Sequence, residues 1–219
     1  MVKNYIKRLV YCNLGLFLMG FSSMLCVRAG EVGTNAWNTL SIGINARTGL
    51  SFGTATFVVS LLIMLIAFTG QGKLGLGSVC NVVLIPVFSD LCLKWCAFIP
   101  EATNPVVGIL FTLAGQTLTS VAAVIYMRPA LGCGPRDTLM VLLGKKFPKV
   151  PIGVIRLAVE CTALVAGVLL GAPFGIGTVL VMVLQASIFQ AVCKVMHCEP
   201  RDVPHESIKE SLAKIKQNA

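Results

Sequence analysis

Charged residues, aromatic residues and histidine are all scarce in this chain. Of its 219 residues, 12% are charged, 7% are aromatic and two are histidine. Soluble domains carry about 25% charged residues, so the shortage excludes an ordinary soluble protein. Motifs of enzyme active sites are also missing: we find no Gly-rich phosphate loop, no Ser/His/Asp set and no Cys/His spacing for zinc. We therefore expect no enzyme activity, no metal and no cofactor.

Hydrophobic residues are what the chain has in abundance. They make up 56% of it, and the mean hydropathy is +0.84, which predicts an integral protein of the lipid bilayer. The net charge of +9 does not indicate a nucleic-acid partner, because Lys and Arg lie between apolar runs and in the tail, without interleaved aromatic residues. The first apolar run, 9–27, is not followed by a cleavage site and a soluble domain, so we expect it to stay in the protein.

Six apolar stretches are long enough, or nearly so, to cross a bilayer. A span needs about 20 residues in helical form, because backbone groups in lipid must be paired within the segment. The predicted membrane helices are 9–27, 52–69, 75–96, 105–127, 151–171 and 175–196. The segments 33–47 and 132–149 are too short to span, and we expect interfacial or re-entrant helices there. Residues 200–219 form a predicted cytoplasmic tail with an exposed charged helix from Glu206 to Lys216.

The two halves of the chain resemble each other. A shift of 100 residues aligns Gly15 with Gly115, Arg28 with Arg128, Gly53 with Gly153, Gly75 with Gly175 and Gly77 with Gly177. We therefore predict two repeats, 1–100 and 101–199, with three spans each, so that the second is inverted relative to the first. Secondary transporters often have this design, with binding sites near the repeat interface. Lys and Arg concentrate in the loops on the side of the N-terminus, which predicts that both termini are cytoplasmic.

The best candidate site begins at the segment Gly132-Cys-Gly-Pro-Arg136-Asp137, which a shift of 99 residues aligns with Gly33-Thr-Asn-Ala-Trp37-Asn38. Glycines permit a tight turn, and Pro135 suits the first turn of a helix. A half-helix starting here would direct its positive end into the protein, where an anion could bind beside Arg136. The alternative is an ordinary helix start with Arg136 facing lipid phosphates.

A second candidate lies inside the fifth apolar stretch, where Arg156 and Glu160 share one helix face. Ionisable residues inside membrane helices are costly and usually face the protein interior or a water-filled cavity. Glu160 could then carry a proton. Arg156 could instead extend to the interface, with Glu160 only balancing its charge. We add Gln116 and Gln185, polar residues within other apolar stretches, as candidates that line the same site.

The quoted motifs carry a resemblance to a known family. The segments Leu131-Gly-Cys-Gly-Pro-Arg-Asp-Thr-Leu-Met140, Val154-Ile-Arg156-Leu-Ala-Val-Glu160 and Leu170-Gly-Ala-Pro-Phe-Gly-Ile-Gly-Thr178 resemble the YczE/YyaS/YitT group of bacterial membrane proteins. In the first half, Arg28-Ala-Gly-Glu-Val-Gly33 fits as well, although Pro-Trp-Asp is the more familiar form at Ala36-Trp37-Asn38. The resemblance covers residues 9–197 and implies a multi-pass protein of the bacterial inner membrane, without naming a substrate.

Two functions are compatible with the sequence. The first is a small transporter-like permease for a small, anionic solute, with Arg136, Asp137, Arg156 and Glu160 at its site and Trp37 and Asn38 contributed by the first half. The second is a membrane scaffold without transport, which docks a cytoplasmic partner through the basic segment 144–149 and the tail. Either could act as a homodimer. A cavity that reaches Arg156 and Glu160 would favour the permease.

Overall fold

A computed structural model of the protein describes residues 2–69, 75–132, 134–198 and 206. Every regular element within those ranges is a helix, as the sequence predicts. The predicted tail helix lies outside the described residues apart from Glu206, and so does Cys133 of the candidate motif.

Eight α-helices and one short 3₁₀ helix make up the described part of the fold. The first half contains α1 (Val2–Val27), η1 (Gly30–Val32), α2 (Ala36–Thr48), α3 (Phe52–Thr69) and α4 (Leu76–Trp95); the second half contains α5 (Pro105–Met127), α6 (Pro135–Lys146), α7 (Ile152–Leu169) and α8 (Ile176–Val195). A helix thus covers each of the six predicted apolar stretches. The two short helices, α2 and α6, occupy the segments that we expected to be too short to cross the membrane.

The helix ends follow from local chemistry. The Asn104 side chain accepts a hydrogen bond from the backbone N–H of Val106 at 2.8 Å, and Pro105 stands in the first turn of α5. Both features satisfy or remove N–H groups that have no partner within a helix. The C-terminal end of α2 shows the complementary feature. Gly49, which follows it, adopts a left-handed conformation with φ of 73°, and this ends a helix at little steric cost.

Four helices in the described ranges are long and apolar enough to cross a membrane: Tyr5–Val27 of α1, Leu76–Trp95, Pro105–Met127 and Ile176–Val195. A fifth span results if α2 and α3, which meet at an angle of 117°, count as one broken span; they could equally form a re-entrant loop. Large apolar side chains are exposed on the outer helices, for example Val183 at 70% and Leu169 at 81%, as expected for surfaces in lipid. The protein is a multi-pass membrane protein, and the arrangement with six spans stays a prediction.

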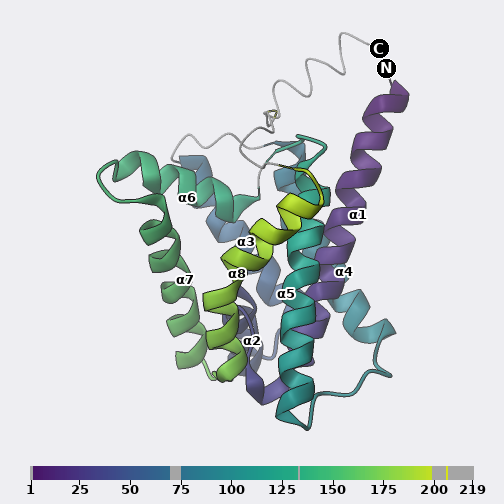
Figure 1. Ribbon diagram of the computed structural model, residues 1–219, viewed down its shortest axis with the longest axis vertical. Helices are drawn as coiled ribbons and strands as arrows, with labels where there is room; N and C mark the ends of the chain where they lie inside the picture. The colour runs from purple at the N-terminus through teal and green to yellow at the C-terminus, as the bar shows by residue number, and fades with distance from the viewer. Residues whose placement is uncertain (1, 70–74, 133, 199–205, 207–219) are drawn as a thin grey trace.

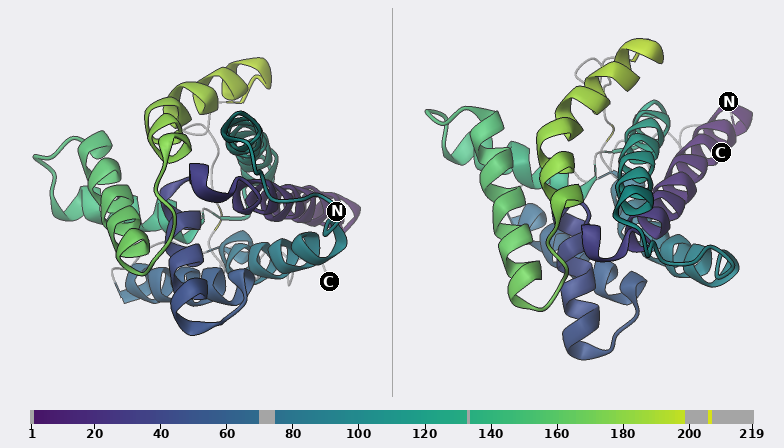
Figure 2. Two further views of the ribbon diagram at one scale, coloured as in Figure 1. Left: turned by 90° about the horizontal axis from the view of Figure 1, so that it is seen from below. Right: turned by 60° about the horizontal axis from the view of Figure 1, so that its bottom comes forward.

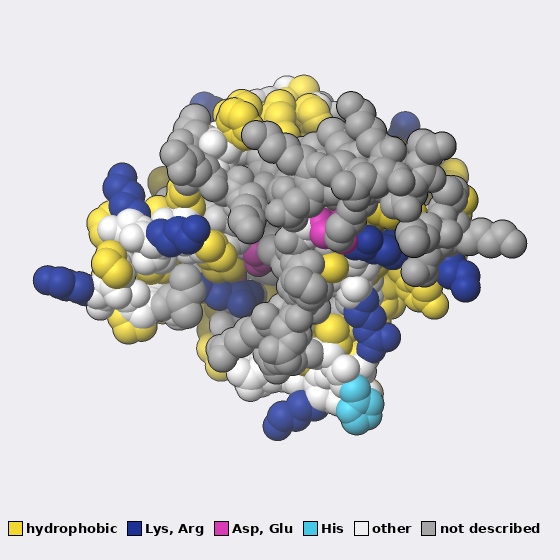
Figure 3. All heavy atoms as spheres, turned by 90° about the horizontal axis from the view of Figure 1, so that it is seen from above, with side chains coloured by type: hydrophobic (Ala, Val, Ile, Leu, Met, Phe, Trp, Pro, Cys, Tyr) yellow, Lys and Arg dark blue, Asp and Glu magenta, His cyan; other side chains and the backbone are white. Residues whose placement is uncertain are grey.

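The long helices run roughly along one axis, with the short ones at its two ends (Figure 1). In that view α1 descends from the upper end, α5 ascends beside it, and α8 also finishes at the upper end. Helix α6 lies near the upper end and α2 near the lower end. Packing pairs α1 with α5 and α4, α5 with α8, α2 with α7, and α3 with α4 and α6; the views in Figure 2 show α7 and α8 on the side away from α1. Lys and Arg side chains are spread around the upper end (Figure 3).

Close approaches at glycine hold the central pair together. A Cβ atom at Gly15 of α1 would lie 2.7 Å from the backbone nitrogen of Tyr126 in α5. A Cβ atom at Gly115 of α5 would lie 2.6 Å from Sγ of Cys26 in α1. Both distances are far inside van der Waals contact, so only glycine lets the two backbones approach this closely.

Asp90, near the end of α4, contacts the start of α3. Its carboxylate accepts hydrogen bonds from Oγ of Ser51 at 2.5 Å and from the backbone N–H of Gly53 at 2.7 Å. A carboxylate suits the first turn of α3 because that turn has unpaired N–H groups and a partial positive charge. The first turn of α3 is therefore held against α4.

Candidate functional site

The motif of the second half forms a turn and then a helix, as predicted. Gly132 has φ of 126°, a value that suits glycine, and α6 begins with Pro135 in its first turn and Asp137 nearby. The loop before it is held from outside: Arg8 of α1 donates to the carbonyl of Pro129 at 2.8 Å and pairs with Glu206 at 2.8 Å. The loop that leads to α6 is thereby held against α1 at Pro129.

The motif of the first half starts a helix in a related way. The side chain of Asn35 accepts a hydrogen bond from the backbone N–H of Asn38 at 3.0 Å and caps α2. Asn38 is buried, while Trp37 is partly buried. This cap places the side chains of Trp37 and Asn38 in the first turn of α2, at the positions that correspond to Arg136 and Asp137 in α6.

A cavity of about 500 Å³ lies among these helices. Its volume is within the range of about 300–1,000 Å³ that is usual for small-molecule sites. All eight residues proposed from the sequence line it, although they come from α2, α5, α6, α7 and α8: Trp37, Asn38, Gln116, Arg136, Asp137, Arg156, Glu160 and Gln185. The structure therefore brings them together in one place, and their role in binding a solute stays a prediction.

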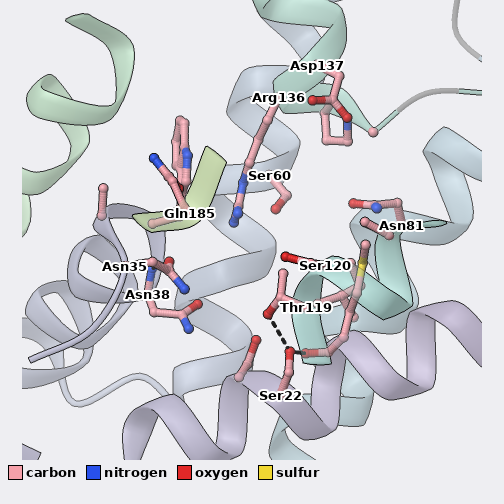
Figure 4. A pocket seen from close by; sticks show the side chains of 18 of the residues that line it. Ser22, Asn35, Asn38, Ser60, Asn81, Thr119, Ser120, Arg136, Asp137 and Gln185 are labelled. Carbon is pink, nitrogen blue, oxygen red and sulfur yellow. Dashed lines mark hydrogen bonds between the residues drawn. The ribbon is translucent and has the colours of Figure 1, made fainter. Parts of the chain in front are cut away.

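Arg136 meets Trp37 inside this cavity. Its guanidinium carbon lies 4.6 Å from the centroid of the Trp37 ring, which is the geometry of a cation–π contact. Figure 4 shows the Arg136 side chain reaching down from α6 toward Ser60 and the asparagines of α2. Burial lowers the pKa of Arg136 to about 10, while the charges of Asp137 and Glu160 raise it, so the guanidinium is charged at neutral pH.

Glu160 stands between a charged and an uncharged partner. Nε of Arg156 donates to one carboxylate oxygen at 3.0 Å, and the amide of Gln185 donates to the other. Glu160 is 8% exposed, whereas the side chain of Arg156 is 46% exposed. The predicted pair thus exists, and Gln185 of α8 joins it, so that this group links α7 to α8.

Sequence reasoning missed the hydroxyl groups of the cavity. The lining also contains Ser22, Thr56, Ser60, Thr119, Ser120 and Tyr126. Ser and Thr in a membrane helix commonly bond to their own backbone, as Ser120 does to the carbonyl of Gln116 at 3.0 Å, so they gave no signal by themselves. The alignment of the two halves could have found two of them, since the shift of 100 residues aligns Thr56 with Arg156 and Ser60 with Glu160.

Comparison with known proteins identifies a family, but the description of that family names no activity. The model for the "Family of unknown function (DUF6198)" matches residues 6–194. An uncharacterized protein of Haemophilus influenzae is 31% identical over 191 residues, covering 87% of this chain and 85% of its own. The uncharacterized membrane protein YczE of Bacillus subtilis is 29% identical over 195 residues, with 87% of both chains covered. This relative confirms the resemblance predicted from the motifs. No solved structure matches.

Proposed function

Because the chain belongs to the DUF6198 family, whose function is unknown, we propose a function from the cavity itself: the protein is a small permease that carries a small, anionic solute across the cell membrane. The observation that carries this proposal is the cavity of about 500 Å³ with Arg136, Arg156 and Glu160 in its wall. Charges are costly inside a membrane protein and are retained mainly where they serve a pathway or a site. A packed scaffold has no need of such a cavity.

Reciprocal contacts support two inverted repeats. Gly15 packs on the segment of α5 around Tyr126, and its counterpart Gly115 packs on the segment of α1 around Cys26. The shift of 100 residues turns the first pair, Gly15 with Tyr126, into the second pair, Gly115 with Cys26. A two-fold axis between the halves produces this reciprocity, because each contact is then made twice with the partners interchanged.

Two further sets of contacts are also made twice, once in each half with the partners interchanged. A Cβ atom at Gly75, before α4, would collide with the carbonyl oxygen of Leu131, and one at Gly175, before α8, would lie 2.5 Å from that of Val32. Leu131 and Val32 immediately precede the glycines of the two motifs. The packing of α2 on α7 likewise matches that of α6 on α3. These relations support a two-fold arrangement of the halves.

From these contacts we infer six spans: α1, α3 and α4 in the first half, and α5, α7 and α8 in the second. Helices α2 and α6 then enter from opposite ends, which fits their positions in Figure 1. The upper end, where α1 begins and α8 finishes, is the cytoplasmic side, because Lys and Arg are spread around it (Figure 3) and cytoplasmic loops carry an excess of both. Both termini are then cytoplasmic.

In this mechanism Arg136 binds the anionic group of the solute, and Trp37 provides the opposing surface from the other repeat. Their contact separates the two ends of the molecule, so the solute passes when α2 and α6 move apart. Glu160, held by Arg156 and Gln185, couples movement of α7 to α8.

Reconstitution into vesicles tests the proposal with a mixture of solutes. Vesicles with the protein, and vesicles with Arg136→Gln, are incubated with a bacterial metabolite extract, washed, and analysed by mass spectrometry. We expect at least one anion to accumulate only with the unaltered protein. Lys145→Gln is the matched control, since Lys145 also lies in α6 but is exposed and outside the cavity. Vesicles that accumulate nothing beyond protein-free vesicles would contradict transport.

One observation favours the alternative function, a membrane scaffold that docks a cytoplasmic partner. Lys145, Lys146 and Lys149 are all exposed at the end of α6 and in the loop after it, where they could contact an acidic partner. Replacing all three with Gln should abolish such docking and leave solute uptake intact. The same variant therefore separates the two functions.

A further inference from the structure

The cavity favours one chemical class of solute. Resting on the proposed function, we propose that its ligand is a small hydroxy acid: one carboxylate attached to a body that carries several hydroxyl groups. Figure 4 shows the arrangement, with Arg136 above and a group of amide and hydroxyl side chains below it.

The two repeats contribute different chemistry at matching positions. The shifts of 99 and 100 residues align Trp37 and Asn38 with Arg136 and Asp137, and Thr56 and Ser60 with Arg156 and Glu160. All eight side chains line the cavity. Each charged position of the second half thus has a neutral counterpart in the first half. The cavity therefore combines charged side chains with uncharged side chains that can form hydrogen bonds, and a ligand that fits both carries the same two kinds of group.

Arg136 is the group that holds the carboxylate. Within the described part of the chain its guanidinium makes no hydrogen bond, and its close contact is with the face of the Trp37 ring. The donors at the edge of the guanidinium plane are thus open to a ligand. A carboxylate matches the spacing of these donors and can accept two hydrogen bonds at once.

The two carboxylates of the cavity, Glu160 and Asp137, limit the charge that the ligand can carry. Both oxygens of Glu160 already accept hydrogen bonds, one from Arg156 and one from Gln185. Asp137 stands next to Arg136 and raises its pKa, so the two charges of α6 partly offset each other. A second carboxylate on the ligand would meet the negative charges of Glu160 and Asp137. The balance favours a single negative charge.

The uncharged polar side chains of the cavity account for the hydroxyl groups of the ligand. They are Ser22, Asn38, Thr56 and Ser60 of the first half and Thr119 and Ser120 of α5. Ser22 and Thr119 share a hydrogen bond of 2.8 Å, which is drawn in Figure 4, yet each hydroxyl can donate once and accept twice. Several of these hydroxyls also bond within the protein, as Thr56 does to Ser41 and Ser120 to the carbonyl of Gln116. An apolar body would leave their remaining hydrogen-bonding positions without a partner, which is unfavourable. A hydroxylated body supplies those partners.

The protein carries its own probe for this test. It has two tryptophans: Trp37 lines the cavity, and Trp95 is 66% exposed at the end of α4. Trp95→Phe therefore leaves a single tryptophan, the one in contact with Arg136. Purified Trp95→Phe protein in detergent is titrated with gluconate, with sorbitol, which has the hydroxyls without the carboxylate, and with hexanoate, which has the carboxylate without the hydroxyls.

We expect a saturable fluorescence change with gluconate or with a shorter member of its series, down to glycerate. Sorbitol and hexanoate should bind roughly ten- to a hundredfold more weakly, because each lacks one set of hydrogen bonds. Adding Arg136→Gln should weaken gluconate binding by a similar factor, whereas adding Lys145→Gln should leave it unchanged. Size-exclusion chromatography checks that each variant is folded.

Several results would overturn the inference, and the first two need no variant at Arg136. Sorbitol or hexanoate binding as tightly as the best hydroxy acid would remove one half of the proposed ligand. No saturable response from glycerate through gluconate would remove the whole class. Unchanged gluconate binding in folded Arg136→Gln protein would place the carboxylate elsewhere.

Uptake measurements separate this inference from the proposed function. Vesicles that carry an anion without hydroxyl groups, but neither bind nor carry hydroxy acids, would retain the proposed function and refute the ligand class. Protein that binds gluconate through Arg136 but moves nothing across vesicles would retain the ligand class and refute transport.

Discussion

Removing Arg156 alone should destabilise the protein more than removing Arg156 and Glu160 together. Glu160 is 8% exposed, and its carboxylate accepts hydrogen bonds from Arg156 at 3.0 Å and from Gln185. In Arg156→Leu the carboxylate keeps its desolvation cost and loses the opposite charge. In the double variant, with Leu at both positions, that cost disappears along with the attraction.

The expected magnitude follows from the exposure of the two partners. Removing one member of a well-buried ion pair costs about 3–5 kcal/mol. Here the Arg156 side chain is 46% exposed and Gln185 still donates to the carboxylate, so we expect about 1–2 kcal/mol for Arg156→Leu. For a chain of this size that corresponds to a fall in Tm of roughly 2–8 °C. The double variant should recover about half, with the unpaired amide of Gln185 accounting for the remainder.

Thermal unfolding of detergent-purified protein measures these differences. The unaltered protein, both single variants and the double variant are compared under one set of conditions. Thr162→Leu serves as the control, because Thr162 is exposed on the same helix and its hydroxyl bonds to the carbonyl of Ala158 in its own helix. A Tm of Arg156→Leu within about 1 °C of the unaltered protein would contradict the reasoning, and so would a double variant that melts below both single variants.

Three further predictions follow from the fold. Gly15→Leu should abolish folded protein in size-exclusion chromatography, because a Cβ there would lie 2.7 Å from the backbone of α5; Gly153→Ala, where nothing lies within 4 Å, should fold normally. Asp90→Asn should cost about 1–2 kcal/mol and lower Tm, since the charge on the bonds to Ser51 and Gly53 is lost. Reporter fusions at the two ends of the chain should both be active in the cytoplasm, and a C-terminal reporter active only outside it would refute the six-span inference.

The positions of the helices could be predicted from sequence because lipid leaves the backbone little choice. Each apolar stretch must pair its own N–H and C=O groups and so becomes a helix, and helices indeed cover all six stretches. The starts of α2 and α6 could be predicted from Asn35 and Pro135 through local capping chemistry. The contact that holds the start of α3 against α4 could not, since it depends on Asp90, which lies 37 residues after Gly53 along the chain.

In the candidate site, the charged residues could be predicted from the sequence and the hydroxyl residues could not. Arg156 and Glu160 attract notice because charge is rare in an apolar run, and Arg136 because it replaces an uncharged counterpart. Thr56 and Ser60 do not, because a hydroxyl is common in a membrane helix and its partner can be its own backbone. Matching positions also need not share surroundings: a Cβ at Gly53 would collide with α4, whereas one at Gly153 would meet open space. Such differences depend on tertiary packing.

The contact between Trp37 and Arg136 has a consequence for the history of the chain. Under the proposed two-fold arrangement these positions correspond, and each faces its own counterpart across the axis. Two identical copies of an ancestral half could offer only Arg facing Arg, which repel, or Trp facing Trp, which binds no anion. A ring facing a guanidinium requires copies that differ, so under this arrangement the two halves had to diverge before this centre could form. Positions 37 and 136 should therefore covary among homologues.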